Sequence, residues 1–82
     1  LQSFLAIADQ GTVRAAAESL GLSQPAVSKS LRALELVLGA DLIKREARGS
    51  SLTPAGQLLY ARARLIENEM HRASADIRDL VG

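Results

Sequence analysis

The sequence of 82 residues contains no cysteine and a single histidine, His71. Disulfides and thiolate metal sites are therefore excluded, and one imidazole is too few to build a zinc site. Only Phe4 and Tyr60 are aromatic, whereas alanine and leucine are abundant, so the composition favours helix over sheet. No apolar run approaches the roughly 18 residues that a membrane helix needs, and no signal peptide is visible. These absences predict a cytoplasmic protein without a metal, a cofactor or a membrane partner.

The chain also lacks a large excess of charge of either sign. It has 10 Lys and Arg residues and 9 Asp and Glu residues, which gives a net charge of +1. A nucleic-acid-binding chain usually carries a clearer basic footprint, so the distribution of charge matters more than the total. The segment 23–34 holds Lys29 and Arg32 and no acid. In the segment 42–56, Lys44, Arg45 and Arg48 outnumber one acid. The bases thus concentrate in the middle of the chain.

The first half of the chain shows helical periodicity with clear boundaries. Leu1, Phe4, Leu5 and Ala8 recur at i, i+3, i+4 and i+7, and Gly11 ends this first predicted helix. Thr12 is a typical N-cap for a second helix over 13–20, with Ala16, Ala17 and Leu20 on its inner face.

A third helix is predicted over 24–38, after Gly21 has closed the second. Ser23 is its N-cap and Pro25 lies in its first turn, where the missing N–H does no harm. The expected inner face of this helix has apolar residues at steps of four, three and four, namely Val27, Leu31, Leu34 and Leu38.

The segment after Gly39 predicts a hairpin and then a long helix. Residues 41–45 and 51–53 are the expected strands, joined at the turn signal Arg48-Gly49. Thr53 and Pro54 mark the start of the fourth helix. This helix carries a 3.5-residue apolar period, typical of a coiled-coil seam between two copies of the chain. The predicted seam consists of Leu59, Ala63, Ile66, Met70, Ala73, Ile77 and Leu80.

The second and third predicted helices have the spacing of a helix-turn-helix, with Ala17, Gly21, Leu22 and Val27 at the packing and turn positions. In that motif the second helix enters the DNA major groove, so it needs an apolar back and a polar, basic front. The candidate front residues lie on one side of the third helix or at its exposed N-terminus: Ser23, Gln24, Pro25, Ser28, Lys29 and Arg32. Gln24 can pair with adenine and Lys29 can donate to guanine.

These motifs together resemble the N-terminal domain of LysR-type transcriptional regulators. The resemblance covers almost the whole chain and is carried by GTVRAAAESL at 11–20, LSQPAVSKSLRALE at 22–35, GADLIKR at 39–45, Arg48-Gly49, and LTPAG at 52–56. The ordered run is specific, whereas any one of these motifs alone would be weak. Val13 and Ile43 stand where the family often has phenylalanine, and Arg14 stands where a small hydroxyl residue is common.

The resemblance implies a mainly α fold, a winged helix-turn-helix over 1–53 followed by a linker and dimerisation helix over 54–82. It implies a homodimer with antiparallel fourth helices on double-stranded DNA, and higher oligomers in the full-length protein are left open. The front residues would read bases, and Arg48 would reach the minor groove. Because the chain starts and ends at helical patterns, we expect a fragment whose missing C-terminal domain binds a small-molecule effector.

Interpretations of these residues that involve no contact with DNA remain open. The front of the third helix can be an ordinary solvated face, Arg48 a solvated turn residue, and Lys44 and Arg45 strand-edge charges. An enzyme is not expected, because no histidine lies near a candidate nucleophile. The alternative function is a helical dimerisation module that never contacts DNA.

Overall fold

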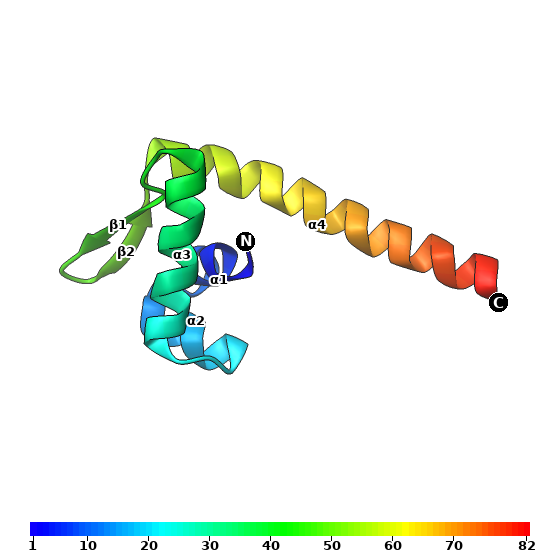
Figure 1. Cartoon of the computed structure of the whole chain (residues 1–82), viewed down its shortest axis with the longest axis horizontal. Coiled ribbons are helices and arrows are strands. Elements are labelled where there is room, and N and C mark those ends of the chain that lie inside the picture. The colour runs from blue at the N-terminus through cyan, green and yellow to red at the C-terminus, as the bar shows by residue number, and fades with distance from the viewer.

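The computed structural model describes all residues 1–82 and contains four helices and one hairpin. The elements are α1 (Gln2–Gln10), α2 (Val13–Leu20), α3 (Gln24–Leu38), β1 (Ile43–Glu46), β2 (Gly49–Leu52) and α4 (Pro54–Val81). Figure 1 shows α1, α2 and α3 gathered into a body, with the hairpin projecting on one side and α4 running far out on the other. No helix is both long and apolar enough to cross a membrane.

The helices begin where hydroxyl side chains satisfy the free N–H groups of the first turn. Thr12 Oγ1 accepts from the Ala15 N–H at 3.0 Å, and Ser23 Oγ accepts from the Ala26 N–H at 3.2 Å. Thr53 Oγ1 caps α4 in the same way, at 3.0 Å from the Gly56 nitrogen. The predicted bounds of α2 and α3 are confirmed, because these caps are local sequence signals.

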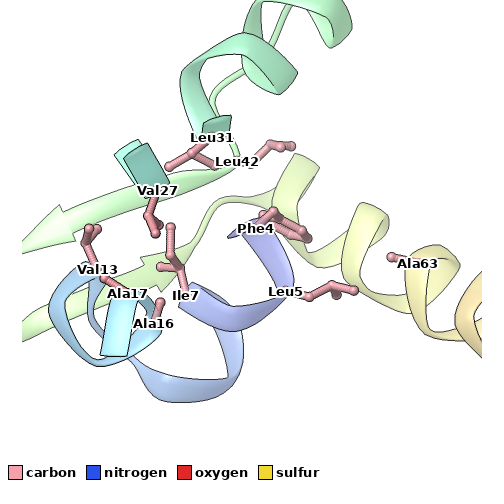
Figure 2. Packing of buried hydrophobic residues seen from close by; sticks show 10 residues of the cluster. All are labelled: Phe4, Leu5, Ile7, Val13, Ala16, Ala17, Val27, Leu31, Leu42 and Ala63. Atoms are coloured by element: carbon pink, nitrogen blue, oxygen red, sulfur yellow. The ribbon is translucent and has the colours of Figure 1, made fainter. Parts of the chain in front are cut away.

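The core lies between the three body helices, and Leu42 and Ala63 are its fully buried members from the rest of the chain. Phe4 and Ile7 of α1 and Val27 of α3 are fully buried in it. Figure 2 shows Leu42, which precedes β1, near Leu31 and Phe4, and Ala63 of α4 near Leu5. The body, the root of the hairpin and the start of α4 therefore share a single core.

Two apolar residues expected to be inside are half exposed. Leu38 keeps 49% of its surface and Leu22 keeps 50%. The end of α3 extends past the body, where Leu38 borders an open apolar groove with Ala40 and Leu58. Leu22 lies in the turn after α2, and the space between α2 and α3 is filled by the fully buried Val27 instead.

The hairpin is present, but its strands differ from the prediction. They pair antiparallel with Ile43 opposite Leu52 and Glu46 opposite Gly49. Strand β1 starts two residues later than expected, because Leu42 is held outside the ladder. Its N–H donates to Glu35 Oε2 at 2.7 Å and its carbonyl accepts from the Thr53 N–H at 3.0 Å.

The helix α4 touches the body only over its first turns. Its inward-facing residues are Gly56, Leu59, Tyr60, Ala63, Arg64 and Glu67, each buried or half buried, and every residue from 68 to 82 is exposed. This placement corrects two members of the predicted seam. Ala63 is 0% exposed and Leu59 packs against the same core, so both contact their own body, and Ala63 has no surface left for a second chain.

Candidate nucleic-acid interface

The predicted front of α3 lies free of the body. Lys29 and Arg32 are exposed and Ser28 is half buried, while Ser23, Gln24 and Pro25 are exposed at the start of the helix. On the opposite side, Val27 and Leu31 are buried in the core. The one-sided burial gives α3 the apolar back and the polar front that insertion into a groove requires.

The basic side chains of α3 and the hairpin have no ionic partners. Every ion pair of the structure involves Arg14, Arg64 or Arg72, and none involves the bases of this face. The unpaired bases are Lys29, Arg32, Lys44, Arg45 and Arg48. Between residues 23 and 53 there are five bases and three acids, compared with five bases and six acids in the rest of the chain.

Two of those three acids already accept hydrogen bonds from other groups of the chain. Glu35 Oε2 accepts hydrogen bonds from the backbone N–H groups of Leu42, at 2.7 Å, and Ile43, at 3.5 Å. Glu46 Oε1 accepts from the Ser51 hydroxyl at 2.8 Å. These carboxylates therefore position the hairpin, and neither neutralises a base on the face.

A groove of about 480 Å³ separates α3 from the hairpin. Its polar lining includes Ser28, Arg32 and Arg45, and the Arg45 Nη2 group donates to Ser28 Oγ at 3.4 Å. The sequence left open that Arg45 is a strand-edge charge. The structure shows that Arg45 instead reaches Ser28 of α3, across 17 residues of chain.

Arg48 stands apart from the α3 residues. It is exposed in the turn between β1 and β2, and Figure 1 shows the hairpin tip pointing away from the body. The root of the tip is fixed, because the Ser50 N–H donates to the Gly11 carbonyl at 2.9 Å. Gly49 has a φ of 131°, and a Cβ there would lie 3.0 Å from that same carbonyl oxygen, so both the backbone conformation and the tight approach favour glycine.

A second polar cluster, which sequence reasoning missed, joins α1 to α4. Tyr60 Oη donates to Asp9 Oδ1 at 2.6 Å, and the Arg64 guanidinium binds Asp9 Oδ2, Glu67 and the Tyr60 oxygen. The hydrogen bond from Arg64, followed by that from Tyr60, lowers the pKa of the Asp9 carboxyl below its ordinary value. The partners are 51 and 55 residues apart, so no local spacing announces them.

No group of three or more His, Asp or Glu side chains lies close enough together to hold a metal ion. The fold and the basic face together define a DNA-binding type of architecture, the winged helix-turn-helix, in which a hairpin flanks the second helix of the motif.

Comparison with known proteins agrees with this class. The family model described as "Bacterial regulatory helix-turn-helix protein, lysR family" matches residues 1–57. The chain is 43% identical over 82 residues to the transcriptional regulator PtxR of Pseudomonas aeruginosa, covering 100% of this chain and 26% of PtxR. It is 45% identical over 67 residues to the regulator TdcA of Escherichia coli K12, covering 82% of this chain and 22% of TdcA.

Solved structures confirm the winged helix-turn-helix fold. The DNA-binding domain of CbnR, crystallised in a complex with DNA, matches with a TM-score of 0.91 and 36% identity, over 99% of this chain and 93% of that domain. The BenM DNA-binding domain in its complex with benA site 1 DNA matches with a TM-score of 0.82 and 31% identity, over 94% and 91% of the two chains.

The chain therefore belongs to the LysR family of bacterial regulatory helix-turn-helix proteins. It spans about a quarter of the length of the curated relatives it matches, at 26% of PtxR and 22% of TdcA.

Proposed function

We propose that this chain binds double-stranded DNA sequence-specifically, as the DNA-binding domain of a homodimeric transcriptional regulator. The helix α3 enters the major groove and Arg48 enters the adjacent minor groove. The observation that carries the proposal is the face of five unpaired bases on α3 and the hairpin, in a chain whose other bases are mostly paired or far along α4. The likeness to two domains crystallised with DNA supports it.

The side chains divide by chemistry into two roles. Gln24 and Lys29 carry the donors and acceptors that distinguish adenine and guanine in the major groove. Ser23, at the exposed start of α3, and Arg32, beside the hairpin groove, suit phosphate oxygens. The remaining contacts of the proposed interface are Pro25, Ser28 and Arg48, all exposed or half buried. A narrow minor groove has a strongly negative potential, which attracts an arginine such as Arg48.

We infer that a second copy covers the exposed side of α4. Large apolar side chains follow this helix far beyond the body, and Leu80 keeps 86% of its surface. Contiguous exposed apolar surface marks an interaction site, and a two-fold dimer presents two α3 helices to a two-fold DNA site. The proposed seam keeps Ile66, Met70, Ala73, Ile77 and Leu80, and gains Leu58 and Leu65, which are also exposed.

This proposal assigns a different function to each part of the chain. Residues 1–53 form the DNA-binding unit and residues 54–82 the linker and dimerisation helix, whose first turns also complete the core. Because the relatives are about four times longer, we place a small-molecule effector site in a further domain of the whole protein. We also propose that it acts on the chromosome in the bacterial cytoplasm, binding DNA without enzymatic activity.

The rival function is a dimerisation module that does not touch DNA. Fluorescence anisotropy with a labelled duplex at several salt concentrations separates the two. We expect affinity to fall steeply with salt, with the slope reduced by about 1 to 2 when Lys29 and Arg32 are both changed to alanine. Arg78→Ala, which removes an exposed base at the far end of α4, should leave the slope unchanged. Absence of binding at low salt, or a slope insensitive to the double substitution, would favour the rival.

A further inference from the structure

The direction of α4 relative to the body is fixed over a short contact. The inward-facing residues end with Arg64 and Glu67, and everything from residue 68 onward is free of the body. At the last contact the apolar packing is thin, because the buried residue is Ala63, which offers only a methyl group. Packing at that point alone does little to resist a change in the angle of the helix.

The polar cluster of Asp9, Tyr60 and Arg64 lies at this last contact. Tyr60 Oη donates to Asp9 Oδ1 at 2.6 Å, and the Arg64 guanidinium binds the other oxygen of the same carboxylate. Tyr60 and Arg64 are one helical turn apart, so one carboxylate of α1 holds α4 at two points along its axis. Two points of attachment define a direction, which a single contact does not.

The cluster is also braced from within α4. Arg64 Nη1 donates to Glu67 Oε1 at 2.6 Å, and its Nε donates to Tyr60 Oη at 3.2 Å. The guanidinium carbon lies 5.1 Å from the centre of the Tyr60 ring, within the range of a cation–π contact. The Tyr60 hydroxyl and all three nitrogens of the Arg64 guanidinium thus have partners within the cluster or in Glu67.

A small rotation at this point has a large effect at the end of the helix. The 17 residues from Arg64 to Val81 (81 minus 64) correspond to about 26 Å of helix. A tilt of about 10° at Arg64 would displace Val81 by roughly 4 to 5 Å, which exceeds the rise of about 3.4 Å for one base-pair step. In an antiparallel pair, that far end lies beside the body of the partner.

We propose that the Asp9–Arg64 ion pair, together with Tyr60, determines the spacing between the two DNA half-sites that the dimer accepts. These residues are positioning residues for the two α3 helices and do not contact DNA themselves. The proposal rests on the DNA-binding dimer proposed above. It adds a determinant of specificity that lies outside the residues proposed to contact DNA. The ligand it selects is a two-fold duplex site of one defined spacing.

The test is a selection of bound duplexes from a random-sequence library, followed by sequencing. For the unmodified chain we expect paired half-sites at one dominant spacing. Asp9→Asn and Arg64→Met should return the same half-site sequence but a broadened distribution of spacings. In competition binding, the preference for the best spacing over its one-base-pair neighbours should drop from about tenfold to threefold or less. The double variant should broaden no further than either single variant, because the two residues act as one contact.

Glu18→Gln is the matched control, since it also removes one ion pair, the exposed Arg14–Glu18 pair within α2, and leaves the link between α1 and α4 in place. It should keep the narrow spacing. Tyr60→Phe removes a single hydroxyl and keeps the ring, so it provides a mild variant that should broaden the spacing partly. Unchanged spacing in Tyr60→Phe and Asp9→Asn, or equal broadening in Glu18→Gln, would overturn the proposal. Recovery of no preferred sequence by the unmodified chain would instead overturn the proposed function.

Discussion

Gly56 gives a prediction in which the structure and helix propensity disagree in sign. It is the third residue of α4, and replacing a helical glycine by alanine ordinarily stabilises a protein by up to roughly 0.5 to 1 kcal/mol. Here an added Cβ would overlap the carbonyl oxygen of Leu42 and lie 3.3 Å from Leu52 Cδ2. The obstructing oxygen belongs to backbone, and it already accepts the Thr53 N–H at 3.0 Å.

Relief of that overlap requires α4 to move away from the root of the hairpin. Overpacking of this kind costs about 1 to 3 kcal/mol, and a clash with backbone places Gly56→Ala at the upper end. After subtraction of the propensity gain, we expect a net destabilisation of about 2 kcal/mol. For a chain of 82 residues this corresponds to a fall in Tm of roughly 10 °C.

Thermal unfolding followed by circular dichroism measures the effect, at one protomer concentration because dimerisation shifts Tm. Gln57→Ala, at the exposed next position of α4, is the control and should change Tm by less than about 2 °C. A Gly56→Ala variant that melts at or above the temperature of the unmodified chain would refute the packing of α4 over Leu42.

Three further predictions concern DNA contact by Gln24, the proposed dimer seam, and the pH dependence of stability. Gln24→Ala should weaken binding to the selected site by roughly 1 to 3 kcal/mol while leaving random DNA nearly unaffected, and equal losses in anisotropy would remove its base-reading role. Ile66→Asp should dissociate the dimer in analytical ultracentrifugation, because it places a charge in the seam, and a persisting dimer would show that the seam is misplaced. Since the pKa of Asp9 is lowered by its partners, its ion pair stabilises the fold above the unfolded pKa near 4 and is lost as the pH falls further. The Tm difference between the unmodified chain and Asp9→Asn should therefore shrink below about pH 4, and a constant difference would contradict that assignment.

The local architecture was predictable because its signals are local. Thr12, Ser23 and Thr53 are each followed by a helix whose first turn they cap, and the structure shows all three caps. The turn at Gly21 has a left-handed φ of 67°, which explains why glycine marked the end of α2. The exposed front of α3 also followed from periodicity, since a helix with a buried stripe leaves the opposite side outside.

What sequence reasoning missed depends on distances that periodicity does not encode. The apolar period of α4 identifies which residues avoid water, and it cannot tell the chain's own body from a partner. Leu59 and Ala63 contact the chain's own body, whereas the apolar residues from Ile66 onward are exposed, because the body ends near Glu67. The predicted burial of Leu38 was wrong for the same reason, since α3 continues beyond the helices that would have covered this side chain.

The long-range polar contacts were beyond prediction for a related reason. Arg45 meets Ser28, and Asp9 meets Arg64, only once the chain has folded. Polar and charged residues on helices and strands are usually solvated, so nothing in the spacing of these four residues distinguished them from the others. Their partners depend on how the hairpin and α4 dock on the body.

Amide hydrogen exchange with and without a DNA duplex tests the central claim most directly, namely that the exposed side of α3 lies against DNA. We expect a bound duplex to slow exchange at the start of α3, over 24–32, and around Arg48, with little change over 68–82. Protection confined to α4, or an unchanged α3 in the presence of a duplex that demonstrably binds, would contradict it.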